Sequence, residues 1–323
     1  MAGQGPPRRN DGRPSQKKPK GRPKRPASGS TRGGRERPSP HKAEEVPGVR
    51  NPYVRFRKLE RPPLEPALTT LWEYPSQHYG KGEQGSSSYR GATPSWVIWQ
   101  VIQRFTRTGA RVLDPFCGSG TTLDVCRDTK RDGVGFDVSP YRADIQKADA
   151  RQLPLADASI DLAFLDPPYA DNLTYSDAPD CIGKTRAQDG SYFAAMDDVF
   201  REMERVLRPG GHLAIYVQDI LQSRGGGKAP RFWPLGIELS HLAAARFSMV
   251  DHVSVVRRNK DLQKGSYRKA ASEQGFWLRG FNHLLIFEKS VEPAGGRARK
   301  TTSSSKKTRR SASPAKKKTR RQH

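Results

Sequence analysis

Short apolar runs and stretches of helical periodicity alternate along the middle of the chain. The runs have the length of buried strands and lie at residues 110–114, 133–137, 160–165 and 212–218. Residues 121–129, a stretch after Ser139-Pro140, and residues 192–207 have the spacing expected of helices. Strands joined by helices at this pitch predict an α/β fold with a doubly wound, mostly parallel sheet.

The pattern continues on both sides of this alternation. Thr93 and Pro94 predict the start of a further helix, with Thr93 as its N-cap and Pro94 at the first helical position. Residues 235–246 have helical spacing again. Residues 247–256 and 282–288 then predict a terminal antiparallel pair of strands, joined by a basic and flexible connection.

Composition divides the chain into three parts. Residues 1–50 hold 14 Lys and Arg against 4 Asp and Glu, and residues 291–323 hold 12 against 1. These two segments therefore carry +21 of the formal net charge of +25. Both are poor in apolar residues and rich in Pro, Gly and Ser, which predicts disordered basic tails. Residues 51–290 remain as one domain, in which residues 51–93 form an irregular lead-in.

Charge and composition also narrow the function. Polycationic tails attract nucleic acid through counterion release, but they carry no sequence specificity. No apolar run approaches the ~18 residues of a membrane span, and no apolar segment follows the first basic residues. Cys117, Cys126 and Cys181 lack metal-ligand spacing, which fits a reducing compartment without zinc or disulfides. We therefore expect a cytoplasmic protein, nucleoid-associated if bacterial, with no metal and no membrane partner.

The tetrapeptide Asp166-Pro167-Pro168-Tyr169 directly follows the apolar run 160–165. Ligands of open α/β sheets lie beyond the carboxyl ends of strands, which is where this tetrapeptide falls. Two consecutive prolines make a stiff loop that holds a carboxylate, main-chain carbonyls and an aromatic ring together. Such a loop suits a planar base with an exocyclic amine, on which Tyr169 would stack. The alternative is an ordinary turn with a surface tyrosine.

The segment from Asp114 to Thr121, D-P-F-C-G-S-G-T, links the first strand to its helix. Gly118 and Gly120 allow the main chain to approach a ligand closely, and the helix N-terminus behind them favours an anion. Asp114 can pair with an ammonium group, so the loop suits an amino acid moiety better than a pyrophosphate. The glycines also do not form the dinucleotide pattern GxGxxG.

Two further acids follow predicted strands. Asp137 ends the second strand, where a carboxylate commonly binds ribose hydroxyls. Asp149, at the next predicted strand end, could reach an adenine amine. Each acid alone is more often a helix cap or a solvated turn residue, but with Asp114 and Asp166 they form a series at successive strand ends. Ammonium, ribose and adenine recognised in that order describe S-adenosylmethionine.

Residues 114–122 (DPFCGSGTT) and 166–169 (DPPY) resemble the motifs of S-adenosylmethionine-dependent amino-methylating DNA methyltransferases, the adenine-N6/cytosine-N4 class. The resemblance covers roughly residues 90–290 and implies a Rossmann-like methyltransferase fold. By this resemblance the cofactor-binding residues are Thr93, Pro94, Asp114, Pro115, Phe116, Cys117, Gly118, Gly120, Thr121, Asp137 and Asp149. The catalytic residues it implies are Asp166, Pro167, Pro168 and Tyr169. The chain departs from the family in lacking a large recognition domain, since only residues 170–190, 221–234 and 257–280 are available.

The expected activity is methyl transfer from S-adenosylmethionine to the exocyclic amine of a flipped-out base in DNA, with adenine N6 favoured. Hydrogen bonds from the amine to Asp166 and the Pro167 carbonyl would favour the pyramidal nitrogen that attacks the methyl group. Cytosine-N4 methylation, RNA methylation at guanine N2 or adenine N6, and protein glutamine methylation are alternatives. A nucleic-acid-binding protein that retains an inactive methyltransferase fold is an alternative from another class. The sequence leaves the target sequence and the oligomeric state open.

Overall fold

The computed structural model describes residues 61–291 except 63, 74–76, 87, 90, 174, 226–227 and 257–264. All of these residues belong to the unit that spans residues 55–323. The predicted tails, apart from residue 291, lie outside the described residues, as do the start of the lead-in and part of the connection before the last strand.

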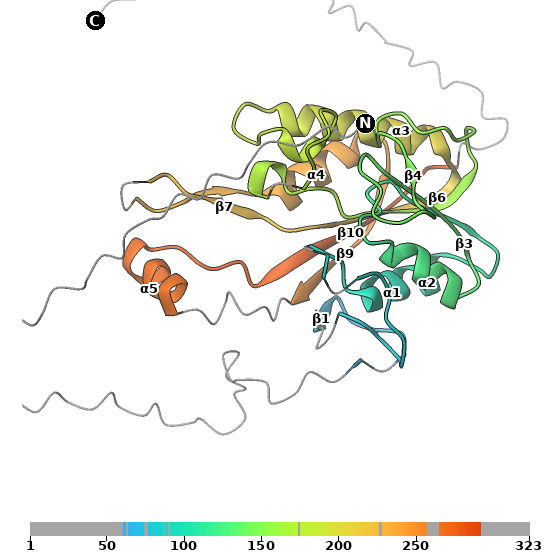
Figure 1. The fold of residues 1–323 in the computed structure, drawn as a ribbon, viewed down its shortest axis with the longest axis horizontal. Coiled ribbons are helices and arrows are strands. Elements are labelled where there is room, and N and C mark those ends of the chain that lie inside the picture. The colour runs from blue at the N-terminus through green and yellow to red at the C-terminus, as the bar shows by residue number, and fades with distance from the viewer. Residues whose placement is uncertain are drawn as a thin grey trace, which may run out of the picture. The chain divides into compact units, whose positions relative to one another are not determined.

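One sheet of eight strands forms the centre of the described residues (Figure 1). Its order is β1-β9-β10-β6-β5-β2-β3-β4. The strands are β1 (Leu71–Glu73), β2 (Arg111–Asp114), β3 (Asp132–Asp137), β4 (Gln146–Lys147), β5 (Ile160–Leu165), β6 (Leu207–Val217), β9 (Ser248–Val256) and β10 (Phe281–Glu288). Neighbouring strands from β4 to β6 are parallel, whereas β10 is antiparallel to both β6 and β9. The predicted doubly wound sheet and its terminal antiparallel pair are therefore confirmed.

Helices cover both faces of this sheet. Figure 1 shows α1 (Ser95–Phe105) and α2 (Thr121–Asp128) on one face, and α3 (Ser191–Val206) and α4 (Leu235–Ala244) on the other. Successive side chains of a strand point to opposite faces. In β5, Leu162 and Phe164 accordingly pack in the core with α1, whereas Ala163 and Leu165 pack with α3. Because both faces are buried, the strand is apolar at every position except Asp161 rather than alternating.

The structure differs from the predicted elements in three places. The stretch after Ser139-Pro140 is not a helix but a series of bends and turns that ends in β4. Helix α1 begins at Ser95 with Pro94 as its N-cap residue, one position later than predicted. The connection before β10 contains an exposed helix, α5 (Gly265–Gln274), whose described side chains include none that is buried.

The lead-in packs against α2 through polar contacts. The hydroxyl of Tyr79 donates to Asp128 at 3.0 Å, and the main-chain N–H of Gly85 donates to Asp124 at 2.7 Å. Gly85 has φ +68°, and a Cβ there would lie 2.2 Å from the Thr121 hydroxyl oxygen. Only glycine permits this close approach. The lead-in thereby reaches the carboxyl edge of the sheet.

Two short strands form a hairpin beside the sheet. Strands β7 (Ile220–Gln222) and β8 (Arg231–Trp233) pair antiparallel in a sheet of their own. The hairpin follows the carboxyl end of β6 and precedes α4. None of the helices in the described ranges is long and apolar enough to cross a membrane.

Candidate active site

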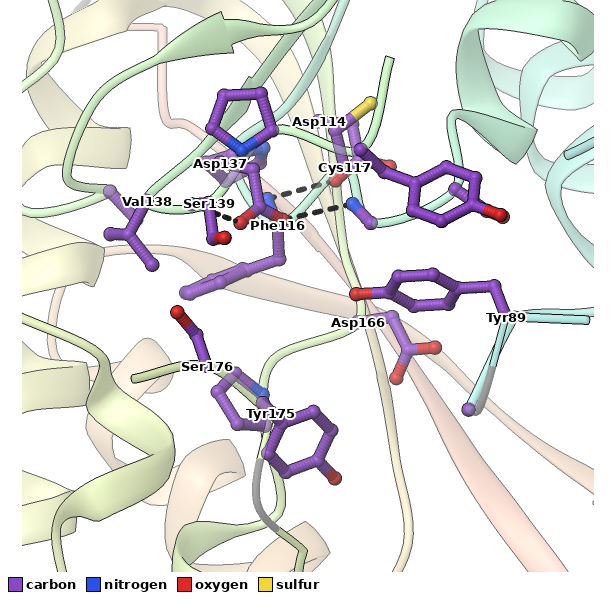
Figure 2. Close-up of a pocket in the computed structure, with 18 of the residues that line it drawn as sticks. Tyr89, Asp114, Phe116, Cys117, Asp137, Val138, Ser139, Asp166, Tyr175 and Ser176 are labelled. Carbon is purple, nitrogen blue, oxygen red and sulfur yellow. Dashed lines mark hydrogen bonds between the residues drawn. The ribbon is translucent and has the colours of Figure 1, made fainter. Parts of the chain in front are cut away.

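The strand order places a cavity at the carboxyl ends of β2 and β5. The chain winds from β2 to β3 on one side and from β5 to β6 on the other, so these two adjacent strands form the switch point of the sheet. Ligands of doubly wound sheets bind in the crevice at such a point. The cavity there has a volume of about 380 Å³ (Figure 2).

Most of the residues predicted for the site line this one cavity. They are Thr93, Asp114, Pro115, Phe116, Cys117, Gly118, Thr121, Asp137, Asp149, Asp166 and Pro168. Pro94, Gly120, Pro167 and Tyr169 do not line it. Pro94 caps helix α1, and Gly120 has φ +82° as the residue before α2, so both shape the main chain beside the cavity.

Asp114 is the most buried acid of the cavity, with 5% of its surface exposed. Its carboxylate accepts hydrogen bonds from the Thr122 hydroxyl at 2.5 Å and from the Phe116 main-chain N–H at 3.0 Å. Burial raises the pKa of Asp114 to about 7, although these two hydrogen bonds oppose the rise. A ligand cation beside this carboxylate would stabilise its charged form.

Gly118 and Asp137 form the next part of the wall. The main-chain N–H of Gly118 donates to Asp137 at 3.0 Å, and the N–H of Ser139 donates to the other carboxylate oxygen at 2.9 Å. Gly118 has φ +47°, and a Cβ there would lie 3.0 Å from the ring of Tyr89. The loop therefore needs glycine at this position, both for its backbone and for the close tyrosine.

Asp149 lies two residues beyond β4 rather than at a strand end. Arg151 donates to both of its carboxylate oxygens, at 2.5 to 3.1 Å. Burial raises the pKa of Asp149, but the hydrogen bonds from Arg151 outweigh it and hold the pKa below its usual value. Asp149 thus faces the cavity as a charged group whose orientation is fixed by an arginine.

The carboxylate of Asp166 is held by two hydroxyl groups. The hydroxyl of Tyr169 donates to Oδ1 at 3.0 Å, and the hydroxyl of Thr93 donates to Oδ2 in a short hydrogen bond. Thr93, predicted as a helix cap, instead fixes the half-buried acid of the tetrapeptide. Both bonds orient the carboxylate before any ligand binds.

Tyr169 is placed behind Asp166, where the sequence predicted a stacking ring. Its side chain packs against the core that contains α3, and burial raises its pKa well above the usual value. The Asn282 side-chain amide donates to its hydroxyl at 3.4 Å. In this arrangement Tyr169 orients Asp166, and stacking of Tyr169 on a base stays a prediction. The role of the Pro167 carbonyl also stays a prediction.

Among the other residues that line the cavity are Tyr89, Tyr175 and Ser176, which the sequence analysis did not single out for the site. Figure 2 shows Tyr89 and Tyr175 near Asp166, with Val138 and Ser139 across the cavity. Burial, followed by the charges of Asp137 and Asp166, raises the pKa of Tyr89 to about 12, so its hydroxyl stays protonated. Tyr175 follows Tyr169 by six residues in the loop after β5, which is the one signal in the sequence that could have indicated it.

The cysteines do not supply chemistry to the cavity. Cys117, Cys126 and Cys181 are buried and unpaired. Burial raises the pKa of the Cys117 thiol far above its usual value, so this side chain of the cavity wall is not a thiolate. Within residues 61–291, as far as they are described, no group of His, Cys, Asp and Glu could hold a metal ion.

The residues of the cavity fit S-adenosylmethionine. The cavity is lined by the buried carboxylate of Asp114 and by two further acids, Asp137 and Asp149. It is also lined by Gly118, where a Cβ would lie too close to Tyr89. Carboxylates accept the hydrogen bonds that an ammonium group, ribose hydroxyls and an adenine amine donate, so Asp114, Asp137 and Asp149 could hold these three groups of the cofactor. Asp166 lines the same cavity, so a group held by it would lie beside the bound cofactor.

Comparison with known proteins supports the same family. The family model described as DNA methylase matches residues 16–148. The type II methyltransferase M.ScaI of Streptomyces caespitosus is 30% identical over 109 residues, which is 31% of this chain and 36% of that protein. M.SmaI of Serratia marcescens is 27% identical over 100 residues, which is 29% of this chain and 32% of that protein. The matched part thus spans only about a third of the length of these relatives.

Solved structures resemble the described fold more distantly. TrmN from Thermus thermophilus has a TM-score of 0.40 at 18% identity, covering 62% of this chain and 50% of that one. A SAM-dependent methyltransferase from Methanosarcina mazei has a TM-score of 0.39 at 15% identity, covering 59% and 98%. Both TM-scores lie below 0.5, so this likeness adds nothing to the fold described above. By the sequence matches, residues 16–148, which include the segment from Asp114 to Thr121, are similar to the DNA methylase family and to type II methyltransferases.

Proposed function

We propose that the protein transfers a methyl group from S-adenosylmethionine to the exocyclic amine of a base in DNA, most favourably N6 of adenine. One observation carries the proposal: Asp166 of the DPPY loop lines the same cavity as Asp114 and Asp137. A methyl acceptor and a methyl donor must meet in one enclosed volume for in-line transfer. The match to the DNA methylase family supports the choice of donor and of substrate class.

The residues of the chain have distinct roles in this reaction. The bound cofactor would supply an electrophilic methyl group: as the N–C bond forms the S–C bond breaks, and the methylated nitrogen then loses one proton to solvent. Asp166, held by the hydroxyls of Thr93 and Tyr169, would accept a hydrogen bond from the base amine. This bond draws the nitrogen lone pair out of conjugation with the ring and strengthens as positive charge develops on the nitrogen. Tyr89 and Tyr175 line the same cavity and would flank the base.

The choice of DNA and adenine rests on the resemblance of the DPPY loop to the amino-methylating DNA methyltransferases. A base inside a duplex cannot reach the cavity, so it would have to be flipped out at a cost of a few kcal/mol. Cytosine N4 is the alternative target within the family. RNA as the polymer is the alternative outside it.

Asp166→Asn tests the catalytic role with a matched control. The amide keeps the size of the side chain but no longer carries the charge that stabilises the amine. We expect methyl transfer to fall about 10²-fold or more, whereas cofactor affinity by calorimetry should stay within a few-fold. Asp171→Asn, five residues further along the same loop and outside the cavity, should change neither quantity. Full activity of the Asp166 variant would contradict the proposal.

A second experiment with the unaltered protein identifies the polymer and the base that are methylated. DNA and RNA are each incubated with the protein and labelled cofactor, and the nucleosides are then analysed by mass spectrometry. Label in N6-methyl-2′-deoxyadenosine from DNA supports the proposal as stated. Label in N4-methyl-2′-deoxycytidine would replace adenine by cytosine as the target, and label in nucleosides from RNA would replace DNA by RNA. Absence of label in every sample, with cofactor bound, would favour an inactive nucleic-acid-binding protein.

A further inference from the structure

An exposed group of aromatic and arginine side chains lies outside the cavity. It consists of Arg231, Phe232 and Trp233 from strand β8, and Trp277, Arg279 and Phe281 from the segment that leads into β10. We call these six residues the aromatic–arginine patch. Trp277 is 81% exposed, Phe232 45% and Phe281 42%. Large apolar side chains gathered at a surface commonly mark a binding site.

The two halves of the patch contact each other through an arginine on an aromatic ring. The guanidinium of Arg279 lies 4.9 Å from the ring centre of Phe232, and that of Arg231 lies 4.1 Å from the ring centre of Trp233. In Figure 1 the β7–β8 hairpin and the segment from α5 to β10 extend to the same side of the sheet. The contact therefore joins residues that are almost fifty positions apart into one surface.

The segments that carry the patch are basic, although Asp219, just before β7, lies close enough to Arg279 for their charges to interact. Residues 220–234 contain Arg224, Lys228 and Arg231 but no acidic residue, and residues 275–281 contain Arg279 and no acidic residue. Nε of Arg279 is buried without a hydrogen-bond partner among the described residues. A surface of this charge fits a polyanion.

The patch adjoins residues 166–169 through the start of strand β10. Phe281 precedes Asn282, whose amide donates to the Tyr169 hydroxyl at 3.4 Å. Tyr169 in turn donates to Asp166. Strand β10 is antiparallel to β6, so its first residues lie at the carboxyl edge of the sheet, where the cavity opens. A polymer that places one base at Asp166 would meet the patch with the nucleotides next to it.

We propose that the aromatic–arginine patch binds unpaired nucleotides adjacent to the target base, with a base stacked on Trp277. Aromatic side chains within a positive groove are the recurring means of binding single strands, because every base has a face that can stack. Bases in a duplex are already stacked on one another and cannot use such a platform. The inference rests on the proposed function for the kind of polymer, and it adds which form of the strand is bound and by which residues.

The test measures binding separately from catalysis. The full chain with Asp166→Asn is titrated into labelled 12-nucleotide oligo(dT), oligo(U), and a DNA duplex of equal length, and fluorescence anisotropy gives Kd. Each titration is done at low and at raised salt, because binding by Lys and Arg outside the patch weakens with salt. The variants are Trp277→Ala, Trp277→Phe and, as matched control, Leu68→Ala, another highly exposed apolar side chain at 91%.

We expect Trp277→Ala to weaken single-strand binding by roughly 5- to 150-fold, the range for loss of one stacked base. Trp277→Phe should keep most of the affinity because its ring still stacks, and Leu68→Ala should keep all of it. Single-strand binding should also quench tryptophan fluorescence in the parent chain and less so in Trp277→Phe, because Trp72, Trp96 and Trp99 are buried. Loss with oligo(dT) alone assigns the strand as DNA, and loss with oligo(U) alone assigns it as RNA.

Two outcomes would overturn the inference. One is a Trp277→Ala variant that binds single strands as well as Leu68→Ala does. The other is a Trp277→Ala effect that is as large for the duplex as for the single strand. Because turnover is not measured, these outcomes are independent of methyl transfer. A patch that binds single strands in a protein without transferase activity would leave the inference standing and remove the proposed function.

Discussion

Asp114 and Asp149 line the same cavity but differ in how their charge responds to pH. Burial raises the pKa of Asp114 to about 7, whereas the hydrogen bonds of Arg151 outweigh burial and lower the pKa of Asp149. Of these two acids, only Asp114 therefore changes its charge near neutral pH. A ligand ammonium group beside Asp114 would favour the charged form of this carboxylate.

Asp114→Asn should flatten the pH dependence of stability. The folded-state pKa of about 7 lies above the ordinary value of 3.8, so folding favours the protonated form. The free energy of unfolding should fall as pH rises from about 4 to 7, by about 4 kcal/mol for this group. The variant amide can still accept from Phe116 and donate to Thr122. Urea unfolding at several pH values measures the slope, and an unchanged slope would contradict the assignment.

The same variant should affect cofactor binding in a pH-dependent way. In the parent chain, affinity for S-adenosylmethionine should increase as pH rises through about 7, because the ammonium group pairs with the ionised acid. In Asp114→Asn the affinity should be lower and nearly constant over this range. Calorimetry at three pH values checks this, and equal pH profiles would exclude Asp114 as the ammonium partner.

Single residues of the cavity could be predicted where chemistry and strand position agree. Asp114, Asp137 and Asp166 follow the ends of adjacent strands, and the structure brings all three into one cavity. Tyr169 differs, because its side chain packs against the core cluster that contains α3 residues and does not line the cavity. Tyr89 could not be identified from the sequence. Its ring lies beside Gly118 because the lead-in is held against α2, where the Gly85 N–H donates to Asp124.

At the scale of elements, the reversed strand β10 has a consequence for catalysis. A parallel strand at this place in the sheet would present its last residues to the cavity edge, but β10 presents its first. Asn282 is thereby placed behind Tyr169, with its Oδ1 buried and unpartnered among the described residues. The element that closes the sheet thus also supports the orientation of Asp166.

Asn282→Ala should lower the rate of methyl transfer through Tyr169. Loss of one hydrogen bond to the Tyr169 hydroxyl should reduce kcat by about 2- to 10-fold. The KM for the cofactor should not change, because Asn282 does not line the cavity. If Asn282 acts through this hydroxyl, Asn282→Ala combined with Tyr169→Phe should be no slower than Tyr169→Phe alone. Independent, multiplied effects in the double variant would show that Asn282 acts by another route.

The strands were more predictable than their connections. Residues 160–165 are mostly apolar and have the length of a buried strand, and the structure buries them on both faces of the sheet. The stretch after Ser139-Pro140 is not helical because residues 146–147 pair with β3 instead, and among residues 141–147 only Ile145 is buried. Tertiary pairing of this kind cannot be read from local spacing.

At the scale of the whole molecule, charge and site are separated along the sequence. Residues 1–50 and 291–323 carry +21 of the net charge of +25. The residues that line the cavity all lie between Tyr89 and Ile182. Affinity for a polyanion and recognition of a base and cofactor should therefore be separable by removing the ends of the chain.

A chain of residues 55–291 should bind S-adenosylmethionine as the full chain does but bind DNA more weakly at low salt. Each lysine or arginine that contacts a phosphate releases a counterion, so the slope of log Kd against log salt should become shallower.

Removing only residues 1–54 takes away a charge of +10, and removing only residues 292–323 takes away +11, which makes these two chains matched controls. Each should lower the slope by a similar amount if charge alone is responsible. An unchanged slope in the shortest chain would show that the 55–291 unit supplies the phosphate contacts itself, and unequal slopes would show that one end binds DNA by more than its charge.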